Sequence, residues 1–339
     1  MTGEDVTTQL VPGVDPGLNE RLLAGLAAVQ ARLSEVIDHD DPFIAGAASY
    51  LSEAGGKRFR PMLTLLAAQV GPLAGDDDAA ARVVDAAVGV ELTHLASLYH
   101  DDVMDEAELR RGVPSANVAY DNSTAILVGD LLFGTASKVI SGLGADAVGI
   151  QADTFVRLCA GQIRDDRPAP DGVDEVDHYL GVLGDKTGSL IATAARYGAM
   201  FSGCDAPTTA LLTEYGEKVG MVFQLADDLL DIASEAADSG KTPGADLREG
   251  KATLPVLIAR SSGDPADDRL RELLAGPLED EGELAEALRL LRAHPAMDAA
   301  RAHTLRVADQ ARATLKELPD GPAVEALRLL VDGVALRSS

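Results

Sequence analysis

The chain has no tryptophan, only two cysteines and few aromatic residues, which make up 4% of its 339 positions. Cys159 and Cys204 lie in apolar stretches without metal-ligand spacing, so we expect small core residues rather than a disulfide or a nucleophile. Basic residues are also scarce, because 29 Lys and Arg stand against 55 Asp and Glu, a formal net charge of -26. Since phosphate neutralisation needs basic surface, nucleic acid is excluded as a partner.

Long hydrophobic runs and targeting signals are missing as well. No apolar run reaches about 18 residues, the length that crosses a bilayer, and the N-terminus lacks the features of a signal peptide. We therefore expect a cytoplasmic protein without a transmembrane segment. Residues 1–16 are polar with glycine and proline, which predicts a flexible tail.

Helical periodicity fills the rest of the sequence. Apolar residues recur at helical rather than alternating spacing from Leu18 to about Arg337. The breaks between these stretches are short, and none has the length or composition of an interdomain linker. The sequence predicts an all-α fold, with residues 17–339 as a single catalytic domain.

Two aspartate clusters carry the chemistry, at residues 101–105 and 227–231. Each places acids at i, i+1 and i+4, so that two carboxylates share one helix face. Like charges at this spacing repel each other, and divalent cations are the simplest compensation. Only oxygen ligands are offered, which favours Mg²⁺ over zinc. In the first cluster Asp101 and Asp105 are the best ligands, followed by Asp102.

Basic and polar residues accompany both clusters. Two arginines follow the first cluster, and a guanidinium group can bind two phosphate oxygens at once. The segment Gly55–Pro61 places two glycines before three basic residues, a plausible phosphate cradle at the start of a helix. The remaining candidates near the acid-rich segments are His94, Arg110, Arg111, Lys186, Thr187, Gln224, Lys241 and Lys251.

Taken in order along the chain, these motifs resemble the trans-isoprenyl diphosphate synthases, also called the polyprenyl synthetase family. The resemblance covers roughly residues 20–335. It implies an isoprenoid synthase-type helical bundle around a central cavity, usually a homodimer. It also implies a Mg²⁺-dependent prenyltransferase that condenses isopentenyl diphosphate head-to-tail with an allylic prenyl diphosphate. Val113 departs from the family, which commonly has a lysine there, as does the helix ending Gln162–Asp166.

The resemblance assigns a role to each matching residue. Metal ligands would be Asp101, Asp105 and Asp227, supported by Asp102, Asp228 and Asp231. The allylic diphosphate would be bound by Arg110, Lys186, Thr187, Gln224 and Lys241. The isopentenyl diphosphate site would contain Gly56, Lys57, Arg60, His94 and Arg111. Lys251 would lie near the metal–diphosphate end.

Product length depends on the side chains one turn or more before Asp101, because each helical turn rises about 5.4 Å, close to one extended isoprene unit. Those positions are Ala96 and Ser97, where short-chain members of the family carry Phe or Tyr. Tyr99 should point elsewhere, since it lies about 200° round the helix. The sequence thus predicts a medium- or long-chain product, as attached to respiratory quinones, with its limit set deeper.

Other functions remain open. A farnesyl or geranylgeranyl diphosphate synthase would use the same chemistry and stop earlier. A subunit of a heteromeric synthase would keep the motifs and need a partner. A terpene cyclase or squalene-type synthase is disfavoured, because it would usually lack Gly55–Pro61 and the second aspartate triplet.

Overall fold

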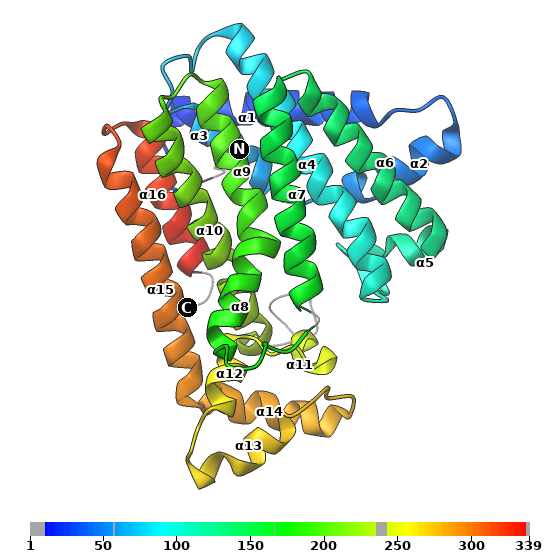
Figure 1. Ribbon diagram of the computed structural model, residues 1–339, viewed down its shortest axis with the longest axis vertical. Coiled ribbons are helices and arrows are strands. Elements are labelled where there is room, and N and C mark those ends of the chain that lie inside the picture. The colour runs from blue at the N-terminus through cyan, green and yellow to red at the C-terminus, as the bar shows by residue number, and fades with distance from the viewer. Residues whose placement is uncertain (1–10, 57, 166, 235–242, 337–339) are drawn as a thin grey trace, which may run out of the picture. The chain divides into compact units, whose positions relative to one another are not determined.

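The computed structural model describes residues 11–56, 58–165, 167–234 and 243–336 (Figure 1). Within these ranges the chain is helical apart from one two-stranded antiparallel hairpin, so the predicted all-α fold is confirmed. The elements in chain order are α1 (Pro16–Ile37), α2 (Pro42–Glu53), α3 (Phe59–Ala68), α4 (Asp77–Met104), β1 (Leu109–Arg110), β2 (Val113–Pro114), α5 (Ala116–Tyr120), α6 (Asn122–Ser141), α7 (Ala145–Asp165), α8 (Glu175–Leu183), the π-helical turn η1 (Gly184–Gly188), α9 (Ser189–Phe201), α10 (Ala206–Ala233), α11 (Ala245–Glu249), α12 (Leu254–Arg260), η2 (Pro265–Asp267), α13 (Asp268–Leu273), α14 (Glu281–Ala293), α15 (Pro295–Thr314), η3 (Leu315–Glu317) and α16 (Pro322–Ala335).

Contacts divide the chain into two compact units, and each is described by itself. Unit 1 comprises residues up to Val156, then Leu190–Gly216 and Leu318–Leu327. Unit 2 comprises Arg157–Ser189, Glu217–Glu317 and the residues from Arg328 onward. The first aspartate cluster belongs to unit 1 and the second to unit 2. That residues 17–339 act as one catalytic domain stays a prediction.

Aspartate caps start many of the helices. The Asp15 carboxylate accepts the Leu18 amide at 2.9 Å and precedes a proline at the first helical position of α1. The same Asp-Pro pair opens α2 at Asp41. This capping satisfies amide groups that have no partner within the helix, and proline is well tolerated there. Part of the large negative charge is therefore used to fix helix starts.

The end of the predicted N-terminal tail packs against the rest of unit 1. Val11 and Val14 are buried, with 1% and 4% of their surfaces exposed. The Val14 amide donates to the Val11 carbonyl at 3.2 Å, one turn before the Asp15 cap. Val11 and Val14 thus belong to the core although the sequence predicted a flexible tail there, and residues 1–10 lie outside the described part of the chain.

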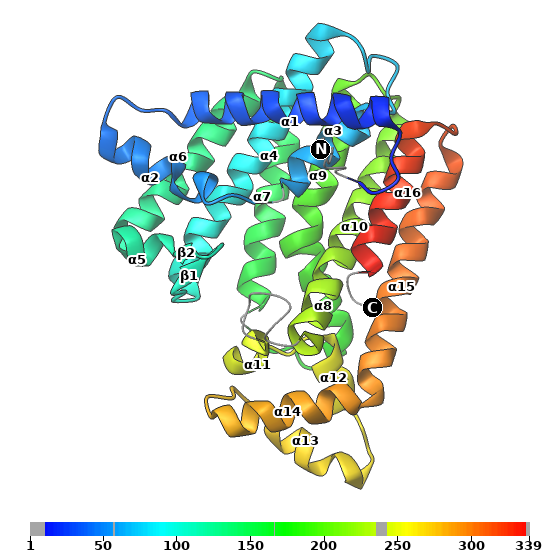
Figure 2. The same cartoon turned by 180° about the vertical axis from the view of Figure 1, so that it is seen from behind.

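The central helix of unit 1 is α4. Its residues 86–93 are all buried, and a helix that is buried on every side belongs in the middle of a core. It packs against α1, α3 and α6, and α4 and α6 lie side by side in both views (Figures 1 and 2). The first aspartate cluster lies at the C-terminal end of this helix, so the core fixes its position.

Helix α6 has a length and composition that we did not expect from the sequence. Among the described residues it is the one helix that is long and apolar enough, by length and composition alone, to cross a membrane. About two-fifths of its most apolar window, 39%, is buried inside the protein. Its contact with α4 accounts for the buried side, and its opposite side carries exposed leucines.

Unit 2 surrounds the second cluster with shorter helices. Helix α12 packs against α8 and α15, and α14 packs against α13 and α15. Leu254, Val256 and Leu257 bury the apolar side of α12. These contacts hold the residues after α11 in place, which positions one wall of the candidate site.

Candidate active site

The first cluster occupies the last turn of α4, and its three carboxylates have different surroundings. Asp102 is fully buried: its Oδ1 accepts Arg110 Nε at 2.6 Å and its Oδ2 accepts the Ala116 amide at 2.7 Å. Asp101 is half-buried, and Asp105 is exposed at the helix end. Asp102 therefore anchors the following loop, whereas Asp101 and Asp105 are left accessible for a ligand.

The loop held by Asp102 is the β1–β2 hairpin. Its two turn residues, Arg111 and Gly112, have φ angles of 54° and 80°. Positive φ at both positions is typical of a two-residue type I′ turn, and only glycine adopts it without cost. Tyr50 supports the far strand by donating to the Pro114 carbonyl at 2.8 Å. The hairpin thus holds the Arg111 backbone in a strained conformation.

The guanidinium of Arg111 lies directly against the glycine pair. Its Nη1 donates to the Leu51 carbonyl at 2.8 Å and to the Gly55 carbonyl. A Cβ on Gly56 would lie 2.9 Å from Arg111 Cζ, and the φ of Gly56 is 143°. Only glycine therefore fits at position 56. The predicted pairing of Gly56 with Arg111 in one subsite agrees with this arrangement.

Arg58, the first described residue after the glycine pair, has a structural role. Its Nη1 donates to Glu91 Oε1 at 2.6 Å, and its Nη2 donates to the Ser52 carbonyl at 2.8 Å. Glu91 is buried with 2% of its surface exposed. A buried carboxylate needs such a partner, so this arginine of the predicted cradle is committed to α4.

Arg60 and His94 are half-buried basic residues of the same region. Burial lowers the pKa of Arg60 to about 10, and its Nε finds no hydrogen-bond acceptor within the described ranges. Burial and the nearby guanidinium groups of Arg60 and Arg111 push the pKa of His94 well below its ordinary value. His94 is therefore neutral, and the guanidinium groups near it outnumber the Glu91 and Asp101 carboxylates that act on the same cluster. Such a cluster favours an anionic ligand.

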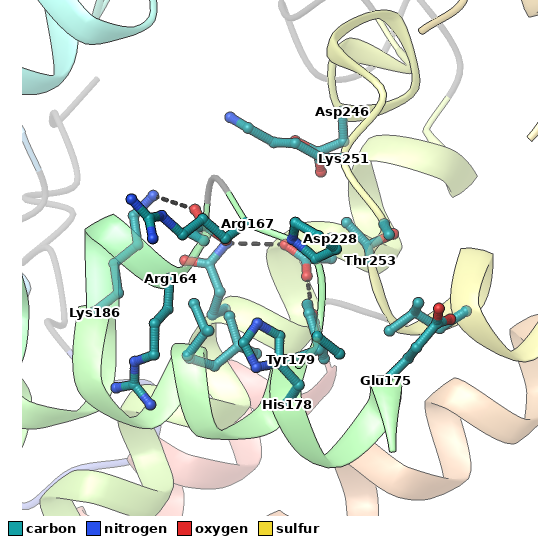
Figure 3. A pocket seen from close by; sticks show the side chains of 18 of the residues that line it. Arg164, Arg167, Glu175, His178, Tyr179, Lys186, Asp228, Asp246, Lys251 and Thr253 are labelled. Atoms are coloured by element: carbon teal, nitrogen blue, oxygen red, sulfur yellow. Dashed lines mark hydrogen bonds and ion pairs between the residues drawn. The ribbon is translucent and has the colours of Figure 1, made fainter. Parts of the chain in front are cut away.

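The second cluster lies near the C-terminal end of α10 and shows the same division. Asp228 is buried, and it accepts Gln224 Nε2 at 2.9 Å and the Tyr179 hydroxyl (Figure 3). Asp231 accepts the Ala245 and Asp246 amides, each at 3.1 Å. Asp227 is exposed. In each cluster, the second aspartate is fixed by protein donors and the first is accessible.

Burial also perturbs the second cluster. It raises the pKa of Asp228 to about 6, with a further contribution from the Asp227 charge. It raises the pKa of Asp246 to about 7, with contributions from Asp228 and Asp231, while Lys251 opposes the shift. Burial and neighbouring carboxylates thus both disfavour the charged forms of Asp228 and Asp246, and a divalent cation would stabilise those forms.

A pocket of about 290 Å³ lies next to this cluster within unit 2. Lys186 and Thr187 line it from η1, and π-helical turns of this kind are frequent at functional sites. Lys186 Nζ lies 2.6 Å from Asp165 Oδ2, and Thr187 Oγ1 lies 3.4 Å from Gln224 Oε1. The pocket therefore brings together four of the predicted residues, Lys186, Thr187, Gln224 and Lys251, beside Asp228.

The same pocket contains residues that the sequence analysis missed. Asp165, Asp246 and Arg167 line it, and Figure 3 places Arg167 and Asp246 near the labelled site residues. The Lys251 ammonium lies 2.5 Å from Glu249 Oε2. His178 Nε2 and Thr253 Oγ1 are buried there without a hydrogen-bond partner in the described part of the chain. Two features of the sequence could have indicated these residues: the acidic pair at 165 and 166, and the spacing of Asp246 from Lys251.

Two of the predicted site residues, Lys57 and Lys241, lie outside the described residues. The predicted chain-length positions are described: Ala96 is 2% exposed and Ser97 is half-buried, with its hydroxyl donating to the His94 carbonyl at 2.8 Å. Tyr99 points away from them, because its hydroxyl donates to the Ala47 carbonyl of α2. That orientation matches the expectation from helical geometry.

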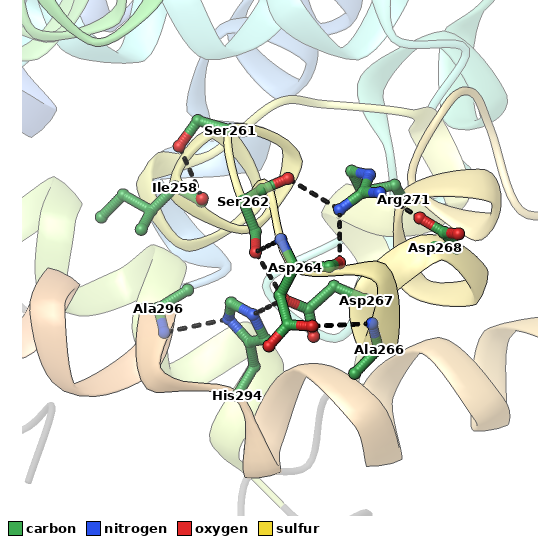
Figure 4. Close-up of polar contacts among 10 residues, drawn as sticks. All are labelled: Ile258, Ser261, Ser262, Asp264, Ala266, Asp267, Asp268, Arg271, His294 and Ala296. Carbon is green, nitrogen blue, oxygen red and sulfur yellow. Dashed lines mark hydrogen bonds and ion pairs between the residues drawn. The ribbon is translucent and has the colours of Figure 1, made fainter.

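A serine, an aspartate and a histidine also meet outside this site (Figure 4). Asp267 Oδ2 accepts Ser262 Oγ and lies 3.1 Å from His294 Nε2. His294 Nδ1 accepts the Ala296 amide at the start of α15. Because Ser262 contacts the aspartate and not the histidine, no base activates its hydroxyl. The group instead joins the α12–α13 connection to the cap of α15.

Comparison with known proteins places these features in a family. Polyprenyl synthetases match residues 41–291. The nonaprenyl diphosphate synthase of Mycobacterium tuberculosis is 48% identical over 95% of this chain and 96% of its own length. The geranylgeranyl pyrophosphate synthase of Corynebacterium glutamicum, complexed with calcium and isoprenyl diphosphate, has a TM-score of 0.85 at 43% identity and covers 95% of this chain and 98% of its own. A decaprenyl diphosphate synthase from Rhodobacter capsulatus has a TM-score of 0.85 at 35% identity, with coverage of 95% and 99%.

The match spans both aspartate clusters, the hairpin and the glycine pair, and the solved relatives share the helical fold over nearly the whole chain. The predicted family, fold and enzyme class, a prenyltransferase, are confirmed. This chain belongs to the polyprenyl synthetase family.

Proposed function

We propose that the protein condenses isopentenyl diphosphate head-to-tail with an allylic prenyl diphosphate to make a medium- or long-chain all-trans polyprenyl diphosphate, a precursor of quinone side chains. One observation carries the proposal. In both clusters a buried aspartate is fixed by protein donors while the first aspartate of the motif is accessible. Accessible carboxylates held in place by buried neighbours suit a metal-bound diphosphate.

Mg²⁺ fits the donor set. No three acidic, histidine or cysteine side chains converge on one point in the described ranges, and Mg²⁺ typically uses one or two carboxylates together with substrate phosphates and water. Asp101 and Asp105 would hold it in unit 1, and Asp227 in unit 2. When bound, Mg²⁺ neutralises charge on the diphosphate oxygens.

The basic residues supply the rest of the substrate binding. Arg60, Arg111 and His94 would bind isopentenyl diphosphate, because the two guanidinium groups offer several donors beside a neutral imidazole, and the nearby Glu91 carboxylate is already paired with Arg58. Lys186, Thr187 and Gln224 would bind the allylic diphosphate, with Arg110, Lys241 and Lys251. Asp165 currently pairs with Lys186, so an incoming diphosphate competes for that ammonium.

The chemistry then needs no nucleophilic side chain. The allylic C1–O bond breaks, and its electron pair leaves with the diphosphate, whose charge the lysines and arginines stabilise. The double bond of isopentenyl diphosphate supplies the electron pair of the new C–C bond. A proton leaves C2 of the added unit to a diphosphate oxygen, which restores a double bond. The lack of a paired serine or cysteine nucleophile in the described site suits this route.

The chain-length positions favour a long product. Ala96 and Ser97 are small, and the ring of Tyr99 is held against α2. Two of the relatives, the nonaprenyl and decaprenyl synthases, are named for long products. The geranylgeranyl synthase of similar identity is named for a shorter one, which keeps the short-chain alternative as the second candidate.

We expect release of inorganic diphosphate when purified protein is mixed with isopentenyl and farnesyl diphosphates and Mg²⁺. The rate should fall to background when EDTA removes the metal and return when Mg²⁺ is restored, because the charge of the departing allylic diphosphate must be neutralised for its C1–O bond to break. Ion chromatography of the released diphosphate measures the rate without a metal-dependent coupling enzyme. Metal-independent release, or no release even with a candidate partner subunit added, would contradict the proposed function.

We also propose that the active form is a cytoplasmic homodimer. In unit 1, Val118, Leu127 and Val156 are 59%, 67% and 68% exposed on α5, α6 and α7. The rings of Phe133 and Phe155 stack with centroids 3.6 Å apart and so connect α6 with α7. Clustered exposed apolar side chains of this kind mark an interaction surface, and a second copy is the occupant we infer.

Sedimentation at micromolar concentration should show twice the monomer mass of 35.2 kDa. Leu127→Glu should shift the protein to monomer, because a buried unpaired charge in the interface is costly. Leu305→Glu, on the 47% exposed Leu305 of α15, serves as the matched control and should remain dimeric. A monomeric wild type, or an unaffected Leu127→Glu, would count against the dimer.

A further inference from the structure

The interior of unit 1 contains a small cavity that the proposed site does not use. It lies among α4, α6, α7 and α9 and is bounded by Gly89, Thr93, Ile140, Gln151, Thr154 and Thr193. About 10 Å³ is open to the centre of a water-sized sphere, roughly enough for one water molecule. The cavity is therefore nearly closed in this structure.

One group in its wall lacks a partner. Gln151 is 6% exposed, and its Nε2 has no hydrogen-bond acceptor anywhere in the described chain. The hydroxyl groups around it are satisfied, since Thr93 donates to the Gly89 carbonyl at 2.8 Å and Thr154 Oγ1 lies 2.6 Å from Thr193 Oγ1. The amide of Gln151 is thus the one group named here that lacks a hydrogen-bond partner, which indicates that a ligand or water enters this cavity.

The cavity lies along the stripe of α4 that begins at Ala96. Gly89, Thr93 and Ala96 are spaced i, i+4 and i+7, which places them on one helix face. Gly89 precedes Asp101 by twelve residues, about 18 Å along the axis. If one extended isoprene unit spans about one helical turn, a chain growing from Asp101 reaches this level at between three and four units.

The far side of the cavity is closed by α6. A Cβ on Gly89 would lie 2.5 Å from Ile140 Cδ1, so the Ile140 side chain fills the space that the glycine leaves. Ile140 is fully buried. A chain that reaches Gly89 can extend further only if Ile140 moves to another rotamer, and it must then pass the Gln151 amide.

We propose that Ile140 and Gln151 control product length, by forming a constriction that the prenyl chain must pass to grow beyond about four isoprene units. This inference rests on the proposed function. Ile140 restricts the width of the path, and Gln151 disfavours apolar groups beside it because they leave its buried amide without a polar partner. Together, the two side chains set the ratio of product that ends near four isoprene units to product that grows longer.

The test compares product lengths of the full-length wild type, Ile140→Ala and Gln151→Leu, using isopentenyl and farnesyl diphosphates with Mg²⁺ and mass spectrometry. Both variants should lower the fraction of product that ends near four units by at least about threefold and extend the longest product by one unit or more. Val139→Ala, on the same helix but outside the cavity wall, is the matched control and should leave the distribution unchanged.

A variant in the opposite direction completes the test. Gly89→Ala combined with Ile140→Ala leaves room for the new methyl group, because both atoms that lie within 3 Å of it are removed, and should shorten the product relative to Ile140→Ala alone. Thermal unfolding of each variant establishes that it is folded. If wild type elongates and the folded variants give the same distribution, the constriction is wrong while the proposed function stands. If the wild type forms no product from substrates that a known synthase accepts, both the proposed function and the constriction are wrong.

Discussion

Replacing Asp101 by Asn should lower the rate of diphosphate release by about 10³-fold, because loss of one group that stabilises developing charge costs on the order of 10²–10³ in rate. Asp101 is half-buried at the end of α4, beside the fully buried Asp102. The amide keeps the size of the side chain and removes its charge. Steady-state release of diphosphate at saturating Mg²⁺ measures the effect.

The matched control is Asp153→Asn, because Asp153 is an exposed aspartate of unit 1 on α7. That variant should keep the wild-type rate, and both variants should unfold at nearly the wild-type temperature. An Asp101→Asn protein with more than a tenth of the wild-type rate would show that the first carboxylate of the motif is not a metal ligand.

The second large effect concerns stability. Asp102→Ala should destabilise the protein by about 3–5 kcal/mol, the usual cost of removing one partner from a buried ion pair. The change leaves Arg110 without its acceptor at 2.6 Å and the Ala116 amide without its acceptor at 2.7 Å. The β1–β2 hairpin then loses its anchor. Urea unfolding followed by circular dichroism measures the shift.

Asp105→Ala is the comparison that separates the two roles within one motif. Asp105 is exposed, so its loss should change stability by no more than about 0.5 kcal/mol, yet it removes a proposed metal ligand and should lower activity. Asp102→Ala, in contrast, should cause a large loss of stability. Equal stability losses in the two variants would contradict the division into anchoring and accessible carboxylates.

The sequence predicted the aspartate clusters, the helices that carry them and the family, because short-range spacing and order encode all three. It did not predict which carboxylate is buried. Asp102 is fixed by Arg110 of β1 and the Ala116 amide of α5, eight and fourteen residues later, and Asp228 by Tyr179, 49 residues earlier. Such partners become visible only once the chain has folded.

The same limit explains the basic residues. The run that follows the glycine pair looked uniform in sequence, but Arg58 is neutralised by Glu91, 33 residues away, while Arg60 Nε has no acceptor in the described ranges. The π-helical turn at Lys186 and the constriction at Gln151 also depend on tertiary packing. Hydropathy did not draw attention to α6, because Asp130 and Lys138 interrupt its apolar residues, so that no uninterrupted apolar run reaches about 18 residues.

The most direct test of this account is the length of the product. Purified protein, Mg²⁺, isopentenyl diphosphate and a farnesyl starter are incubated to completion, and the dephosphorylated prenyl alcohols are sized by mass spectrometry. We predict a ladder that continues well past about four isoprene units, the level that Gly89 reaches along α4. A product that stops at four units, one condensation beyond the farnesyl starter, would contradict the account and identify a short-chain synthase.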